Sequence, residues 1–304
     1  MAQLHDDEAD IGLRTVRALL DDQRPDLAGR PVVPLGEDST GTDNVLYRLG
    51  NDLVVRLPRT PSAAASLVTE TRLMPELVGR LPVDIPAPEY VGVPAAGYPH
   101  PWAVLPWLTG VDAWAARTAL TGAQGLGLAE DLARLVTTLW QVPRAAYEGV
   151  VPTRALGRRG GGLAALDEDL EEWLDETGGL VDVDAVRGSW RESRAAADWD
   201  GRAVLSHGDL IPGNLLVHGG RLSAVIDWGG AGAGDPAIDL IPAWAVLDGP
   251  AAARFRDALG VDDDLWLRAR GYAVQQALAG VVYYMPRRHP LAEVMGRTLA
   301  AILA

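Results

Sequence analysis

The stretch 203–228 constrains the fold more than any other part of the sequence, because polar residues interrupt its short apolar runs at fixed distances. The runs are rich in Val, Leu and Ile and are separated by glycine-containing turns, which predicts short β-strands. The first turn carries the tripeptide HGD, which ends at Asp209, and Asn214 lies five positions later. Asp227 ends the last run. A glycine turn between the last two runs would fold them into a hairpin, so we expect Asn214 and Asp227 at the same end of it.

The residue types at these positions are those that phosphoryl transfer requires. The reaction needs an oriented hydroxyl nucleophile and a means of neutralising the phosphate charge. A carboxylate at Asp209 can orient the hydroxyl and accept its proton. Asn214 and Asp227 offer the hard oxygen atoms that Mg²⁺ prefers. The alternative interpretation is a polar turn in which Asp and Asn only cap loops, and the complete spacing favours the catalytic one.

The same arrangement of motifs is found in kinase-like enzymes. Asp209 and Asn214 are as far apart as the Asp and Asn of the protein-kinase catalytic loop, and the Asp-Trp-Gly that begins at Asp227 is similar to the kinase D-F-G element. Residues 234–240 follow with the sequence GDPAIDL. Together these motifs resemble the aminoglycoside phosphotransferase family. The resemblance implies an α+β, bilobal, protein-kinase-like fold with a small antiparallel β N-lobe and a larger, mainly helical C-lobe.

Three residues near these motifs have supporting rather than chemical roles in this interpretation. The resemblance implies that Asp239 supports the catalytic loop by accepting hydrogen bonds from backbone N–H groups. Asp235 precedes Pro236, which is typical of a helix N-cap followed by proline at the first helical position. His207 is interpreted as a scaffold residue of the loop and not as a base. The five His residues are scattered along the chain, which argues against a His-based zinc site.

Apolar patterning predicts a β-rich N-terminal lobe at 1–106 and a catalytic, substrate-binding lobe at 107–304. Short runs at 32–35, 45–49 and 53–57 predict an antiparallel three-strand meander. A helix is expected at 62–80 with Ser62 as its N-cap. Strand residues are expected around Tyr90 and Val91 and at 102–105. Further helices are expected at 8–22, 126–141, 163–176, 183–197, 236–247, 264–284 and 290–303.

The N-lobe candidates for nucleotide binding begin with an arginine. All 27 basic residues are Arg, so the strand cation that a kinase places on the phosphates cannot be Lys here. Strand alternation puts Arg56 on the opposite face from its apolar neighbours, and Glu70 on the following helix is the expected partner. Arg59 and Glu76 are the competing candidates. An ordinary surface ion pair remains the alternative for Arg56 and Glu70.

Two backbone segments complete the expected nucleotide site. Ser39, Gly41 and Thr42 lie in the first turn of the meander, where backbone N–H groups and small hydroxyls can bind phosphate oxygens; an ordinary hairpin turn is the alternative. Backbone groups near Leu105 and Trp107, at the expected hinge, could bind the base. Trp107 could instead be a core residue.

Composition limits the partners. The net charge is −14 with a pI near 4.7, which disfavours nucleic acid and is compatible with a cationic small molecule or simply with solubility. Carboxylates are dense at 167–176, and a solvated helix face is the alternative to substrate binding there. No apolar run reaches the roughly 18 residues of a membrane span. The chain lacks Cys, and its acidic N-terminus has no apolar core of a signal peptide, so we expect a cytoplasmic protein.

The sequence therefore predicts a Mg²⁺-dependent transfer of the γ-phosphoryl group of ATP or GTP to a hydroxyl of a small molecule. An aminoglycoside-type antibiotic is the preferred acceptor. A kinase of the same fold for a sugar, choline or homoserine remains open, as does a nucleotide-binding protein without catalysis. The sequence leaves the oligomeric state open.

Overall fold

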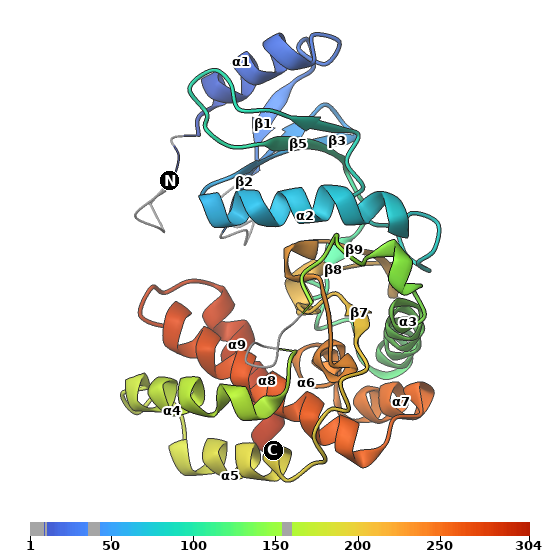
Figure 1. Cartoon of the computed structure of the whole chain (residues 1–304), viewed down its shortest axis with the longest axis vertical. Coiled ribbons are helices and arrows are strands. Elements are labelled where there is room, and N and C mark those ends of the chain that lie inside the picture. Colours follow the sequence, from blue (N-terminus) through green and yellow to red (C-terminus); the bar gives the residue numbers. More distant parts are fainter. Residues whose placement is uncertain (1–8, 10, 36–42, 154–159) are drawn as a thin grey trace. The chain divides into compact units, whose positions relative to one another are not determined.

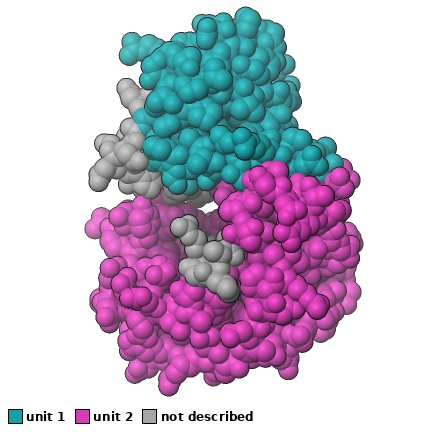
Figure 2. Space-filling model, viewed as in Figure 1, with its two compact units in different colours: residues 1–78, 84–109 teal, residues 79–83, 110–304 magenta. Residues whose placement is uncertain are grey.

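The computed structural model describes residue 9 and residues 11–35, 43–153 and 160–304. The chain divides into two compact units (Figure 2). The first comprises residues 1–78 and 84–109, and the second comprises 79–83 and 110–304. The division therefore follows residue 109, compared with the predicted boundary at 106.

The first unit is built on a five-stranded antiparallel sheet with strand order β1-β2-β3-β5-β4. Its strands are β1 (Val32–Pro34), β2 (Asn44–Leu49), β3 (Leu53–Pro58), β4 (Tyr90–Gly92) and β5 (Trp102–Pro106). The predicted meander is confirmed as β1, β2 and β3. Gly50 turns the chain between β2 and β3 with φ of +62°, a conformation that glycine adopts without steric cost.

Two helices pack on opposite faces of this sheet (Figure 1). Helix α1 (Leu13–Gln23) buries Leu19 and Leu20 completely against the apolar side chains of β2 and β3, and each such burial contributes about 1.5–3 kcal/mol. On the other face, Leu67 of α2 (Pro61–Leu77) packs against Ala103 and Leu105 of β5. Strand β3 is thus buried on both faces.

The start of α2 corrects one prediction. The N-cap is Thr60, whose Oγ1 accepts a hydrogen bond from the backbone N of Ala63 at 3.2 Å, and the expected cap at Ser62 is wrong. The reason is Pro61 at the first helical position, where its missing N–H costs nothing and its fixed φ favours the helix.

The second unit is mainly helical. Its α-helices are α3 (Gly122–Trp140), α4 (Asp167–Glu176), α5 (Val183–Arg194), α6 (Pro242–Ala245), α7 (Gly249–Leu259), α8 (Asp263–Tyr284) and α9 (Leu291–Leu303). Helix α8 packs against α4, α5 and α9. Its middle is fully buried at Tyr272, Val274 and Leu278. Among the helices of the described residues, none is long and apolar enough to cross a membrane.

The helix predictions fail at two places in this unit. The helix expected at 236–247 is a 3₁₀ segment, η5 (Pro236–Leu240), followed by the short α6. Helix α7 was not predicted, and its sequence opens with Gly249-Pro250, a pair that is also typical of a break in a helical pattern. In the structure the same residues begin the helix, with the Asp248 carboxylate accepting from the N of Ala251 at 3.0 Å.

Short strands in the second unit carry the motif residues. They are β6 (Val111–Asp112), β7 (Val204–Ser206), β8 (Leu215–His218), β9 (Arg221–Val225) and β10 (Gly232–Gly234). Strand β7 pairs with β10, and β8 lies between β6 and β9. All of these pairs are antiparallel. The predicted strand–turn–strand of 203–228 is confirmed.

Candidate active site

The HGD turn follows directly from the end of β7. Asp239, which is fully buried, accepts hydrogen bonds from the backbone N of His207 at 3.0 Å and of Gly208 at 2.8 Å. Gly208 has φ of +79°, which favours glycine. The implied role of Asp239 as the support of this loop is confirmed by these contacts.

His207 has a structural environment. The ring is fully buried beside Trp228, with ring centroids 4.6 Å apart. Its Nε2 lies 3.1 Å from the carbonyl O of Ile226, and its Nδ1 lies 3.2 Å from the backbone N of Asp209. A carbonyl only accepts and an N–H only donates, so the ring is neutral with its proton on Nε2. Both nitrogens are engaged by the backbone, which supports the interpretation as a scaffold residue.

The loop can be tested through Asp239. Replacing it with Ala leaves two buried backbone N–H groups without an acceptor, at about 1–3 kcal/mol each, so we expect the free energy of unfolding to fall by about 2–5 kcal/mol. Asp239→Asn keeps one acceptor oxygen and should lose less. Urea denaturation measures both. An Asp239→Ala protein with wild-type stability would contradict this role.

Asp209 and Asn214 form one hydrogen-bonded unit. The Nδ2 of Asn214 donates to the backbone O of Asp209 and to its carboxylate Oδ2, both at 2.9 Å. These contacts fix the amide so that its nitrogen faces Asp209. The Oδ1 of Asn214 receives no hydrogen bond from the part of the chain that the structure describes. It therefore offers an oxygen ligand of the kind that Mg²⁺ prefers.

The β8–β9 hairpin brings Asp227 to the same end as Asn214. Leu215 pairs with Val225, and the N of Ile226 donates to the O of Asn214 at 2.9 Å. Asp227 follows with φ of +60° and an exposed side chain. A non-glycine residue in this left-handed region is strained, and such strain clusters at functional sites. One carboxylate and one amide oxygen at one hairpin end fit a Mg²⁺ ion that keeps several water ligands.

Asp131 of α3 binds strand β9 of this hairpin. Its carboxylate accepts from the Nε of Arg221 at 2.6 Å and from the backbone N of Leu222 at 3.2 Å. Burial raises the pKa of Asp131, but these hydrogen bonds and the charge of Arg221 outweigh it, so the pKa lies below its usual value. This contact is therefore fully formed at neutral pH and weakens only in acid.

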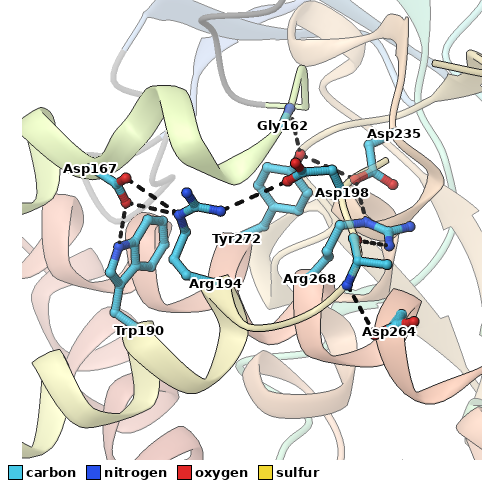
Figure 3. A network of polar contacts seen from close by, with 10 residues as sticks. Gly162, Asp167, Trp190, Arg194, Asp198, Asp235, Asp264, Arg268 and Tyr272 are labelled. Carbon is cyan, nitrogen blue, oxygen red and sulfur yellow. Dashed lines mark hydrogen bonds and ion pairs between the residues drawn. The ribbon is translucent and has the colours of Figure 1, made fainter. Parts of the chain in front are cut away.

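The start of the GDPAIDL motif is tied to α8 through Asp235 (Figure 3). Its carboxylate caps η5 by accepting from the N of Ala237 at 3.0 Å, which confirms the predicted N-cap. The other oxygen accepts from the Nε of Arg268 at 2.9 Å and from the hydroxyl of Tyr272 at 3.4 Å. Burial, reinforced by the adjacent Asp235, raises the pKa of Tyr272, which keeps the phenol protonated as a donor. Gly162 N in turn donates to this hydroxyl at 3.1 Å.

One face of α8 thus contacts both motifs at successive turns. Arg268 and Tyr272 contact Asp235, and Gln276, four residues further, donates from Nε2 to Oδ1 of Asp209 at 2.5 Å. The sequence analysis missed Gln276. The available signal was the spacing of four residues between Arg268, Tyr272 and Gln276, which places their side chains on one side of the helix.

In the first unit the predicted cation and acid are paired. The Nη1 of Arg56 on β3 lies 2.7 Å from Oε2 of Glu70 on α2. Their side chains are 8% and 5% exposed, so this is a buried pair and not the ordinary surface pair that was the alternative. The choice of Arg56 over Arg59, and of Glu70 over Glu76, as residues of the nucleotide site stays a prediction.

The backbone segments predicted to bind nucleotide are described only in part. Ser39, Gly41 and Thr42 lie outside the described residues. Leu105 is buried in the sheet. Trp107 is 42% exposed, with the guanidinium of Arg48 stacked 3.7 Å from its ring centroid, so it is not a core residue. The backbone N–H of Trp107 donates to the backbone O of Asp52 at 2.7 Å. A nucleotide base would therefore have to bind other backbone groups of this segment.

The carboxylates of α4 are mostly exposed, and some bind arginines of α5. Asp167 accepts from Trp190 at 2.8 Å and from Arg194 at 3.1 Å (Figure 3), and Glu171 forms an ion pair with Arg187 at 2.6 Å. This arrangement favours the solvated face over substrate binding. Within the described ranges, no group of three or more His, Cys, Asp or Glu side chains could hold a metal.

Comparison with solved structures identifies similar folds. The GDP and kanamycin complex of APH(2")-IIia has a TM-score of 0.74 and 22% identity, covering 94% of this chain and 96% of that chain. The GDP complex of wild-type aminoglycoside 2'-phosphotransferase-IIIa has a TM-score of 0.72 and 21% identity, covering 96% and 97%. Macrolide 2'-phosphotransferase MphH from Brachybacterium faecium has a TM-score of 0.59 and 23% identity, covering 94% and 97%. These similarities confirm the predicted fold class.

Sequence comparison gives the family. No curated protein sequence matches the chain significantly. Residues 35–303 match the model of the family APH, described as the phosphotransferase enzyme family, and this match spans most of the chain and includes the HGD turn, the hairpin and the GDPAIDL motif. The chain therefore belongs to the phosphotransferase enzyme family and is a phosphotransferase.

Proposed function

We propose that the protein transfers the γ-phosphoryl group of ATP or GTP, in the presence of Mg²⁺, to a hydroxyl of an aminoglycoside-type antibiotic. The observation that carries this proposal is the unit formed by Asp209 and Asn214 at the end of the hairpin that bears Asp227. It combines a carboxylate for the hydroxyl with two oxygen groups for a metal.

Each residue has one role in this proposal. Asp209 orients the acceptor hydroxyl and accepts its proton as the phosphoryl group is transferred. Asn214 and Asp227 hold Mg²⁺, which when bound neutralises charge on the nucleotide phosphates. Arg56 binds the phosphates, with Glu70 holding its guanidinium in place. Nucleotide binding by the family fold is supported by the GDP and ADP complexes among the similar structures.

The acceptor class rests on the similar structures and on charge. Those structures include complexes with kanamycin, gentamicin and streptomycin, and the net charge of −14 attracts cationic compounds. Two macrolide 2'-phosphotransferases are also similar in fold, which makes a macrolide the second candidate acceptor.

A panel assay with γ-³²P-labelled ATP and GTP tests the proposal. Kanamycin, gentamicin, streptomycin, a macrolide, choline, homoserine and a sugar would be offered separately, with and without Mg²⁺. We expect label on an aminoglycoside, only when Mg²⁺ is present. If label appears only on choline, homoserine or the sugar, the acceptor is a metabolite and not an aminoglycoside. No label on any compound, together with no binding of a Mg²⁺–nucleotide, would overturn the proposal.

If Arg56 binds phosphate, substitutions at Arg56 and Glu70 should change protein stability and nucleotide affinity in different ways. Arg56→Met removes the 2.7 Å ion pair from the buried Glu70 charge, which should cost about 3–5 kcal/mol of stability, and should raise the nucleotide Kd at least about tenfold through loss of a charged hydrogen bond. The double variant Arg56→Met/Glu70→Met should recover stability, because an apolar pair replaces the ion pair, but it should still bind nucleotide weakly.

Thermal unfolding and nucleotide titration check this prediction. Arg72→Met, on the exposed side of α2, is the matched control and should behave as wild type in both assays. A double variant that binds nucleotide as tightly as wild type would remove Arg56 from the phosphate site.

A further inference from the structure

Gln276 fixes the carboxylate of Asp209 together with Asn214. Its Nε2 donates to Oδ1 at 2.5 Å, and Nδ2 of Asn214 donates to Oδ2 at 2.9 Å. The two amides come from separate elements, α8 and the loop before β8. Rotation of the carboxylate would break at least one of these contacts, so the orientation of Asp209 is set by both. A carboxylate offers about four acceptor positions, so two amide donors do not by themselves saturate it.

The orientation of the Gln276 amide follows from the chemistry of its partner. An ionised carboxylate only accepts hydrogen bonds, so the NH₂ group must face Asp209 and Oε1 must point to the other side. That oxygen is buried and accepts no hydrogen bond from any residue in the described ranges. A buried acceptor without a donor is uncommon in proteins and is unfavourable. Among the described residues, Oε1 of the adjacent Gln275 lacks a donor in the same way, and the Gln276 amide differs from it in contacting Asp209.

Helix α8 holds the amide in place. Arg268 and Tyr272, on the two preceding turns of the same face, are bound to the buried Asp235 (Figure 3). Ala273, three residues before Gln276, and Ala277, directly after it, are fully buried. A side chain presented from a helix with such contacts is more exactly placed than one on a loop.

We propose that Gln276 is a positioning and specificity residue of the phosphotransferase. Its Nε2 holds Asp209, and its Oε1 accepts a hydrogen bond from a second hydroxyl or an amino group next to the acceptor hydroxyl. This inference rests on the proposed function, because Asp209 must be the residue that receives the hydroxyl. It assigns the acceptor a chemical class, a polyol or amino alcohol with a donor beside the phosphorylated oxygen, in preference to a compound with an isolated hydroxyl.

Two substitutions separate the two halves of this role. Gln276→Met keeps the size of the side chain and removes both hydrogen bonds. Gln276→Glu keeps an acceptor oxygen for the substrate and places a second carboxyl against Asp209, where the two share one proton and Asp209 no longer receives an amide hydrogen bond. Steady-state kinetics would use whichever of kanamycin, gentamicin, streptomycin or the macrolide takes label best. We expect kcat to fall about 10- to 100-fold in both variants. The acceptor KM should rise about tenfold in Gln276→Met and stay within about twofold in Gln276→Glu.

Gln275→Met is the matched control, since Gln275 precedes Gln276 on α8, is buried, and makes no described contact with Asp209. It should keep wild-type kcat and acceptor KM, and nucleotide Kd should be unchanged in all three variants. If wild type transfers phosphate, Asp209→Asn does not, and Gln276→Met behaves as wild type, this inference alone is wrong. It is also wrong if Gln275→Met loses as much activity as Gln276→Met. If wild type transfers no phosphate, or Asp209→Asn remains active, the proposed function fails with it.

Discussion

Asp209→Asn should lower kcat by at least about 10³-fold while leaving the Kd for the Mg²⁺–nucleotide within a factor of about two. The substitution keeps the shape of the side chain but removes the charge that orients the hydroxyl and the oxygen that takes its proton. Binding of nucleotide does not need this carboxylate, because the proposed phosphate and metal contacts come from other residues. Turnover of labelled nucleotide and equilibrium titration of the same samples measure the two quantities.

Asp198→Asn is the control for this variant. Asp198 lies in the same unit, and its side chain is 87% exposed, so turnover should be that of wild type. Substantial turnover in Asp209→Asn would show that another group receives the proton, and the assignment of Asp209 would be wrong.

Asp227→Asn should remove most activity for a different reason. Asn tolerates the left-handed backbone at this position better than other non-glycine residues, so the fold should be kept. The loss of a metal-binding charge should remove several kcal/mol of transition-state stabilisation and so lower kcat about 10³-fold. The Mg²⁺ concentration for half-maximal activity should also rise, since a neutral amide binds the ion more weakly than a carboxylate does.

A magnesium titration of activity checks this second effect, with Asp175→Asn on the exposed side of α4 as the control. Asp227→Ala adds backbone strain of about 1–3 kcal/mol and should therefore be less stable than Asp227→Asn. An unchanged Mg²⁺ dependence in Asp227→Asn would exclude Asp227 as a metal ligand.

The core of the site was accessible from the sequence because its geometry is local. Asn214 and Asp227 are joined by a two-strand hairpin, and hairpin register follows from alternation and turn length. The contact of Asp239 with the HGD turn spans about thirty residues. It could be inferred only from the resemblance to a family. The pairing of Arg56 with Glu70 was predicted from strand alternation together with the kinase arrangement of a strand cation and a helix Glu, and the burial of the pair was not predicted.

The features that sequence reasoning missed depend on tertiary contacts or on ambiguous local signals. Gln276 contacts Asp209, which lies 67 positions earlier in the sequence. The spacing of polar residues on α8 does not by itself predict which motif the helix contacts. Helix α7 begins at a Gly-Pro pair that serves equally well as a break and as a first turn. The cap of α2 was misplaced at Ser62 because Thr60 and Ser62 have similar capping propensity, and Pro61 decides between them.

A crystal structure with Mg²⁺ and a non-hydrolysable analogue of ATP or GTP tests the central claim most directly. The account predicts a metal ion about 2.1 Å from Oδ1 of Asn214 and from a carboxylate oxygen of Asp227. The terminal phosphate analogue should lie on the side of the metal that faces Asp209. A nucleotide whose metal is bound without either residue would contradict the account.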